Sequence, residues 1–151
     1  MKRSLLFGLF CLPVGLITNE ILRNNGKSDE PGFWIFEICV AVVSVLSPSI
    51  LWYFIIERKN IVNIKRGLTV GLLGVELAHF LSWYFFLLIN YLDFFFVGNI
   101  IRTYGSVPIN PLFGIIAALT YSLVSLFLFG LIHFPIGGLM GGMYARKLQN
   151  K

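Results

Sequence analysis

Long apolar runs alternate with short polar segments along this chain. Four runs are each long enough to form a helix that crosses a bilayer, which takes roughly 20 residues. Their approximate ranges are 5–22, 33–56, 67–92 and 112–144. Because a backbone inside lipid must pair its own polar groups, runs of this length predict helices. The expected fold class is all-α: an integral membrane bundle of four transmembrane helices, with residues 1–151 in a single membrane domain.

The polar connections between these runs fit antiparallel neighbours. RNNGKSDEPG is a short turn-forming segment, and ERKNIVNIKR is a short basic one. The third connection, DFFFVGNIIRTYGSVPINP, is longer and aromatic. We therefore expect part of it to lie along the membrane surface.

Composition and charge support the membrane class and predict an orientation. The chain is 57% apolar and 13% charged, whereas charged residues make up about 25% of typical soluble domains. Basic residues of short loops stay on the cytoplasmic side of a membrane. One side collects Lys2, Arg3, Arg58, Lys59, Lys65, Arg66, Arg146, Lys147 and Lys151, and the other holds Arg23, Lys27 and Arg102. We expect both termini to be cytoplasmic, in a plasma membrane such as the bacterial inner membrane.

Two further expectations follow from the basic residues and the N-terminal run. The net charge of +5 is explained by basic flanks that face an anionic leaflet, so no nucleic-acid partner is expected. The first run starts with Lys2 and Arg3 as a secretory signal would, but no convincing cleavage site follows it. It is therefore interpreted as an uncleaved first span, and the lipid bilayer is the expected surrounding.

Glu76 and His79 are ionisable residues inside the third apolar run. Glu76 lies ten residues after Arg66, or about 15 Å along a helix. An ionisable group at that depth is costly and usually faces a partner. Because residues three apart share a helix face, the two side chains are expected to point together into the bundle or toward one partner helix. A protonated Glu76 that bonds His79, Ser47 or a backbone carbonyl, with a purely structural role, is the alternative.

His133 in the fourth run completes a possible polar layer. It precedes Arg146 by thirteen residues, the same separation that places His79 after Arg66. The candidate binding layer therefore consists of Glu76, His79, His133 and Ser47. Equal depth of the two histidines also suggests axial ligation of a b-type haem, since histidine is a usual axial ligand.

Glycines form the candidate helix-packing faces. Small residues let helix backbones approach closely in lipid. The positions are Gly67, Gly71 and Gly74 in the third run and Gly137, Gly138, Gly141 and Gly142 in the fourth. We expect them to pack the third and fourth helices together, with contact to another subunit as the alternative.

Motifs for soluble catalysis are missing from the sequence. It contains no P-loop, GxGxxG, CxxC, HExxH or serine-nucleophile elbow. No catalytic residue, metal site or cofactor is therefore assigned, and an enzyme is the less favoured class. The leading hypothesis is an accessory or interaction subunit that acts through helix contacts with a membrane-protein partner or in a homo-oligomer. The alternatives are transport or sensing of a proton, ion or small solute at Glu76 and His79, and a haem redox carrier through His79 and His133.

Overall fold

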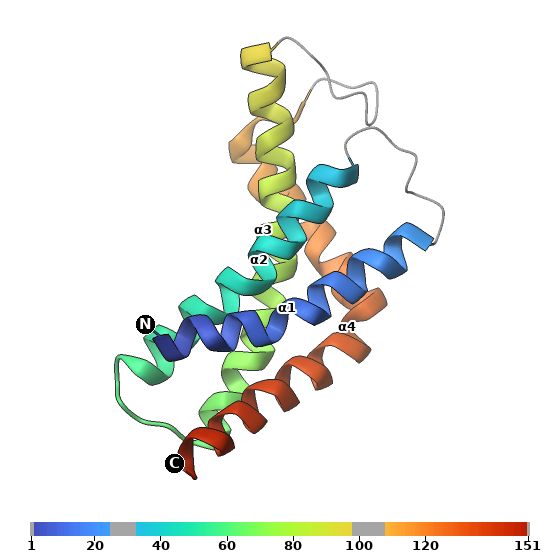
Figure 1. Ribbon diagram of the computed structural model, residues 1–151. Helices are drawn as coiled ribbons and strands as arrows, with labels where there is room; N and C mark the ends of the chain where they lie inside the picture. Colours follow the sequence, from blue (N-terminus) through green and yellow to red (C-terminus); the bar gives the residue numbers. More distant parts are fainter. Residues whose placement is uncertain (1, 25–32, 98–107, 151) are drawn as a thin grey trace.

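The computed structural model describes residues 2–24, 33–97 and 108–150, which form four long helices (Figure 1). These are α1 (Lys2–Leu22), α2 (Phe33–Trp52), α3 (Ile64–Val97) and α4 (Pro111–Gln149), and a π-helical turn, η2 (Tyr53–Glu57), continues α2. The described ranges contain no strand, so the predicted all-α class is confirmed. All four helices contain segments long and apolar enough to cross a membrane.

α3 and α4 are longer than the apolar runs that predicted them. α3 has 34 residues and α4 has 39, which correspond to about 51 and 58 Å of helix. The aromatic segment that was expected to begin the third connection instead continues α3 as far as Val97, because neither glycine nor proline interrupts it. Residues 98–107 of that connection lie outside the described residues. α4 runs through Pro135 without ending.

Side-chain caps account for the starts of α3 and α4. The Asn63 side chain accepts a hydrogen bond from the Arg66 backbone N–H at 2.9 Å, and Asn110 accepts one from Leu112 at 2.9 Å. Each asparagine thereby satisfies a backbone donor that the first helical turn leaves unpaired. Asn60, in the short connection before α3, has a φ of 50°, a conformation that asparagine tolerates better than most residues. These local preferences make the turn between η2 and α3 tight.

Two antiparallel hairpins make up the described bundle. α1 pairs with α2, α3 pairs with α4, and α2 joins the hairpins by packing against α3. Between α2 and α3, the aromatic rings of Phe36, Trp83 and Phe86 pack together with Cys39. The order of neighbours in space therefore follows the order along the chain.

The end of the bundle that carries the termini is held by contacts from all four helices. Figure 1 shows both chain ends close to the turn that follows η2. The fully buried ring of Phe7 lies 4.5 Å from that of Trp52 and 5.3 Å from that of Tyr144, between ring centroids. The Tyr144 hydroxyl donates to the Arg3 carbonyl at 3.1 Å, and the Gln149 side chain donates to the Val62 carbonyl at 3.0 Å.

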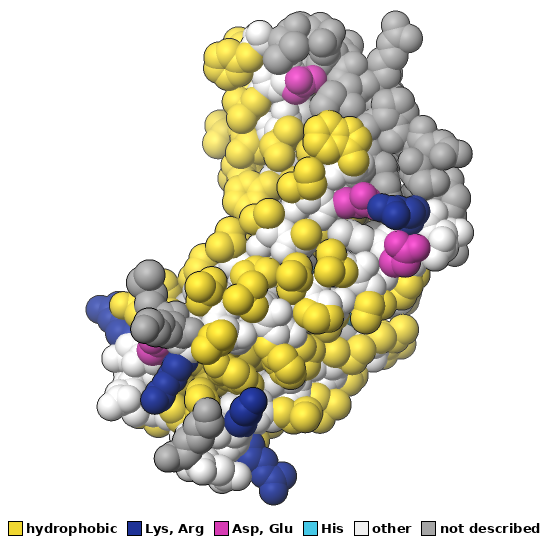
Figure 2. All heavy atoms as spheres, in the orientation of Figure 1, with side chains coloured by type: hydrophobic (Ala, Val, Ile, Leu, Met, Phe, Trp, Pro, Cys, Tyr) yellow, Lys and Arg dark blue, Asp and Glu magenta, His cyan; other side chains and the backbone are white. Residues whose placement is uncertain are grey.

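The exterior of the bundle is apolar along the middle of its length. Figure 2 shows a broad band of hydrophobic side chains, with basic side chains gathered near the end that carries the termini. Strongly exposed apolar side chains also lie on α4, such as Phe127 at 84% and Leu131 at 87% exposure. In water such a surface would be an aggregation hazard, whereas it suits contact with acyl chains or other helices.

Candidate functional site

The glycine faces of α3 and α4 pack directly against each other. A Cβ added to Gly71 would collide with the backbone of Gly137, and one added to Gly67 would collide with the carbonyl of Gly141. The two helices therefore touch through their backbones at two levels. This is the internal packing expected of these residues.

The other three predicted packing glycines are less tightly confined. A Cβ on Gly138 would lie 3.4 Å from the Leu72 side chain, and one on Gly142 would lie 3.1 Å from the Leu68 side chain. A Cβ on Gly74 would lie 3.4 Å from Pro48 on α2, not from α4. Gly74 thus belongs to the joint between the two hairpins.

A second close seam, between α1 and α2, was not anticipated from the sequence. A Cβ on Gly8 would collide with the Ser49 side chain and the Val45 carbonyl, and one on Gly15 would lie 2.6 Å from the Ser44 hydroxyl. Ser44 and Ser49 turn their hydroxyls back onto their own helix, at 2.8 Å to the Ala41 carbonyl and 2.7 Å to the Val45 carbonyl. The seven-residue spacing of the two glycines, about two helical turns, is the signal that could have revealed it.

His79 and His133 form the polar centre of the α3–α4 interface. Nε2 of His79 lies 3.1 Å from Nδ1 of His133, and Nδ1 of His79 lies 2.8 Å from the hydroxyl of Ser125. His133 is buried and His79 is half-buried. The equal separations from the two arginines therefore correspond to a direct contact. Ser125 was missed, although it lies eight residues before His133 and so on the same face of α4.

The hydrogen bonds among these three side chains can run in either of two directions, depending on the histidine tautomers. The Ser125 hydroxyl donates to the Ser122 carbonyl at 3.0 Å, so it accepts the proton of His79 Nδ1. A neutral imidazole carries one proton, which leaves Nε2 of His79 to accept from Nδ1–H of His133. In the reverse direction the Ser125 hydroxyl turns from the carbonyl to donate to His79, and both imidazoles carry their proton on Nε2 instead of Nδ1. The three side chains therefore form a short chain whose donors and acceptors can be exchanged.

Glu76 lies outside this polar group. Its side chain is exposed on the bundle surface, and the described residues give its carboxylate no hydrogen bond or ion pair. The expectation that Glu76 and His79 point together must be corrected. Nine residues separate Glu76 from Gly67, which is two and a half turns of helix. Because Gly67 faces α4, Glu76 faces the opposite direction.

Ser47 also lies outside the expected polar layer. Its side chain is fully buried, and among the described residues its hydroxyl has no hydrogen-bond partner. The bond between Ser47 and Glu76, one of the partners considered for a purely structural carboxyl, is not formed, since Glu76 is exposed. α2 continues as a helix through Pro48, and Pro48 itself packs against Gly74.

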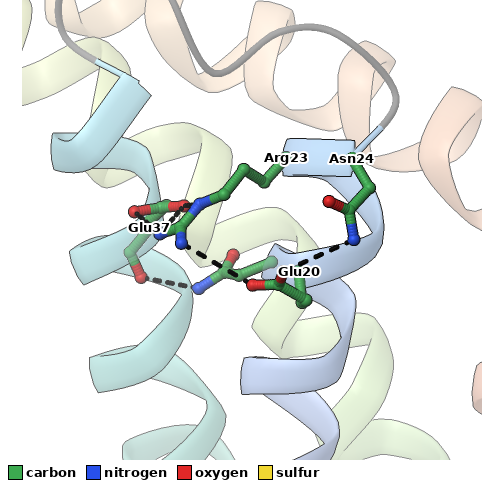
Figure 3. Close-up of polar contacts among 5 residues, drawn as sticks. Glu20, Arg23, Asn24 and Glu37 are labelled. Carbon is green, nitrogen blue, oxygen red and sulfur yellow. Dashed lines mark hydrogen bonds and ion pairs between the residues drawn. The ribbon is translucent and has the colours of Figure 1, made fainter.

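Charged residues pair at the end of the first hairpin remote from the termini (Figure 3). Nη2 of Arg23 lies 3.0 and 3.2 Å from the two carboxylate oxygens of Glu37, and Nε of Arg23 lies 3.2 Å from one of them. The Asn19 side chain donates to the Glu37 carbonyl at 3.0 Å. Glu20 is a more distant partner of Arg23, at 3.7 Å. This group clamps α1 to α2.

The histidine geometry does not fit a haem. Axial ligands of a haem iron approach from opposite faces of the macrocycle, whereas these imidazoles contact each other at hydrogen-bond distance. A macrocycle between them would also force apart the backbones that meet at Gly71 and Gly137. Within residues 2–24, 33–97 and 108–150, no group of three or more histidine, cysteine, aspartate or glutamate side chains is placed to hold a metal ion.

Comparison with known proteins leaves these residues as the basis for a functional argument. No protein-family model, curated protein or solved structure matches the chain.

Proposed function

We propose that the chain is an integral protein of a plasma membrane, such as the bacterial inner membrane, with both termini in the cytoplasm. Support comes from the four apolar helices and from the exposed basic residues at the end that carries the termini. These residues are Arg3, Arg58, Lys59, Lys65, Arg146 and Lys147. Short basic segments of this kind are retained on the cytoplasmic side.

Cysteine labelling tests this orientation. Cys11 and Cys39 are first replaced, and single cysteines are then placed at Lys2, Asn60, Asn150 or Ser28. A membrane-impermeant thiol reagent should label intact cells only at Ser28, and should reach the other three only in inverted vesicles. Labelling of Asn60 in intact cells would rule out the proposed topology.

Within the membrane, we propose a non-enzymatic role as an accessory subunit that binds another membrane protein through its helices. The observation that carries this proposal is the exposed carboxyl of Glu76 on an apolar face, without a partner in the described structure. A carboxyl exposed to acyl chains is unfavourable by a few kcal/mol. Contact with a second protein would remove that cost.

The glycine faces support internal packing and not the subunit contact. Gly67 and Gly71 are covered by Gly141 and Gly137, so they leave no small-residue groove for another chain. The proposed contact surface is instead the face of α3 that carries Glu76, flanked by the exposed side chain of Leu73.

Site-specific photo-crosslinking in native membranes tests the accessory role. A photoreactive amino acid replaces Leu73, one turn from Glu76, or Leu131, which is 87% exposed on α4. The Leu73 position should give a discrete adduct of higher mass, and the Leu131 position should give none. Absence of an adduct at Leu73, together with recovery of a monomer from mild detergent, would overturn the proposal. An adduct at twice the mass of the chain would identify a homo-oligomer.

A second candidate function, proton transport or sensing, is favoured by the chain formed by Ser125, His79 and His133. An imidazole can accept a proton at one nitrogen and release another from the other nitrogen. The two imidazoles are in hydrogen-bond contact. In this second candidate function the histidines exchange the protons, and Glu76 does not take part.

Reconstituted vesicles distinguish the second candidate from the first. A proton gradient is imposed, and a pH-sensitive dye inside the vesicles reports flux. Flux above that of empty vesicles that is lost in His79→Phe and kept in Glu76→Gln would support proton exchange at the histidines. Flux equal to that of empty vesicles would remove transport, and flux lost in Glu76→Gln would return the carboxyl to the mechanism.

A further inference from the structure

The carboxyl on the exposed face of α3 around Glu76 indicates which type of side chain a partner would have to bring. We infer that this face binds a transmembrane helix of a different protein, and that this helix carries a lysine or arginine at the depth of Glu76. The inference rests on the proposed accessory role, and it specifies the residue type that the partner must supply.

Glu76 is placed where a partner helix can reach it. The glycines that face α4 and α2 define the buried side of α3, and Glu76 lies on the other side, where Leu73 is also exposed. The exposed surface around the carboxyl is apolar and lies ten residues, or about 15 Å, from Arg66. A helix that packs there would bury the Leu73 side chain and the carboxyl together.

No basic side chain of the described structure can neutralise this carboxyl. Lys65 and Arg66 lie near the start of α3, and Arg66 donates to the Ile55 carbonyl at 3.3 Å. Arg23 is engaged by Glu37 at the other end of the bundle. Long basic side chains near helix ends also extend toward the membrane surface and away from its centre.

A second copy of the chain does not offer the complementary charge. In a symmetric pair with the same orientation, Glu76 would meet Glu76 at equal depth, and two carboxyls disfavour each other's ionised form. In a second copy, the lysines and arginines whose side chains the structure describes lie near the ends of its helices: Arg3, Arg23, Arg58, Lys59, Lys65, Arg66, Arg146 and Lys147. Charge complementarity at mid-depth therefore indicates another protein.

A basic group on the partner helix would form a charge-assisted hydrogen bond with the carboxylate. Such bonds are about twice as strong as neutral ones. The apolar surroundings exclude water, which strengthens the attraction. Leucine side chains supply packing contacts but little specificity, since lipid competes equally well for them. The charge pair would then determine which helix is accepted.

Synthetic transmembrane peptides of defined sequence test the inference by standing in for the partner helix. The full chain, labelled with a fluorescence acceptor, is reconstituted in phosphatidylcholine vesicles with donor-labelled polyleucine peptides. The peptides differ only at the central residue, which is arginine, leucine or glutamate. The arginine peptide should give energy transfer with the unmodified chain, and the leucine and glutamate peptides should not.

Matched variants isolate the role of the carboxyl. Glu76→Gln keeps the shape of the side chain and removes its charge, so we expect at least roughly tenfold weaker binding of the arginine peptide. Glu20→Gln makes the same chemical change at an exposed site near the end of α1 and should bind as the unmodified chain does. Circular dichroism and thermal unfolding would verify that both variants fold.

Three results would overturn the inference. The first is equal binding of the arginine peptide by Glu76→Gln and the unmodified chain, and the second is equal binding of the leucine and arginine peptides. The third is energy transfer between two labelled copies that Glu76→Gln abolishes and the arginine peptide does not displace, which would identify a second copy as the occupant. An adduct at Leu73 in native membranes, obtained with any of these results, would leave the accessory role standing. Absence of that adduct would count against the role itself.

Discussion

Nε2 of His79 lies 3.1 Å from Nδ1 of His133, although 54 residues separate the two histidines along the chain. The contact fixes the level at which α3 and α4 face each other. A shift of either helix by one residue, about 1.5 Å, would move the two ring nitrogens out of their present contact and separate Gly71 from Gly137. The polar contact and the glycine seam therefore specify the same alignment of the two helices.

Energetic coupling between the two histidines is the first prediction. His79→Ala and His133→Ala should each lower the free energy of unfolding in detergent, and the double variant should cost less than the sum of the two. We expect a coupling free energy of about 0.5–2 kcal/mol, the range for contacting residues and interhelical hydrogen bonds. Ser82→Ala is the matched control, because the Ser82 hydroxyl bonds to the Ala78 carbonyl of its own helix at 2.8 Å. Strict additivity would show that the histidine contact contributes nothing.

A single added methyl group should lower stability at Gly71, which is closely packed, and not at Gly114, which has open space around it. Gly71→Ala places a Cβ against the backbone of Gly137, which cannot rotate away, and we expect a loss of about 1–3 kcal/mol of stability. Gly114→Ala, on α4, places its Cβ where nothing lies within 4 Å. Thermal unfolding should show a clear decrease for the first variant and no decrease for the second. Equal midpoints would mean that the backbones are not in contact at Gly71.

Aromatic truncation should distinguish the buried end of the bundle from its surface. Phe7 is fully buried between Trp52 and Tyr144, whereas Phe127 is 84% exposed. Phe7→Ala should cost about 3–5 kcal/mol, because it leaves a cavity. Phe127→Ala should leave the unfolding midpoint within the error of the measurement. A small effect at Phe7 would show that the end that carries the termini is loosely packed.

The ion pair between Arg23 and Glu37, at the end of the first hairpin remote from the termini, should contribute modestly to the free energy of unfolding. Glu37→Gln removes the two-pronged contact with Arg23, and exposed pairs typically contribute about 0.2–1 kcal/mol. The effect should decrease as salt is added, because ions screen exposed charges. Glu20→Gln, at 3.7 Å from the same arginine, should change stability less than Glu37→Gln. The opposite order would show that Glu20 is the principal partner.

Helix number, helix class and the α3–α4 contact could be predicted because each depends on features that the sequence displays directly. Apolar length predicts a helix, and glycines three or four residues apart mark a face without side chains. The matched separations of His79 and His133 from basic residues indicated a common level. The helix ends were less predictable, since the aromatic residues before Val97 suit both a helix and an interfacial segment.

The direction of Glu76 could not be taken from its spacing to His79. Residues three apart differ by about 60° around a helix axis, so one of them can lie at the edge of an interface while the other is exposed. The glycines held the missing information: if Gly67 faces α4, Glu76 faces away. Depth alone predicted a partner within the bundle, because a carboxyl exposed to lipid is unfavourable. Ser125 was not predicted, because the sequence does not show which of its serines lies beside His79 in the folded protein.

Each hairpin has its own close glycine contacts, and this has a consequence for how the protein assembles. Gly8 and Gly15 let α1 pack closely against α2, and Gly67 and Gly71 let α3 pack closely against α4. Helices that make their closest contacts with a sequence neighbour need no distant segment to pair, so each hairpin can assemble before the other has formed. Packing of Pro48 on Gly74 would then complete the molecule. Two fragments divided within the connection at residues 58–63 should consequently reassemble when they are co-expressed.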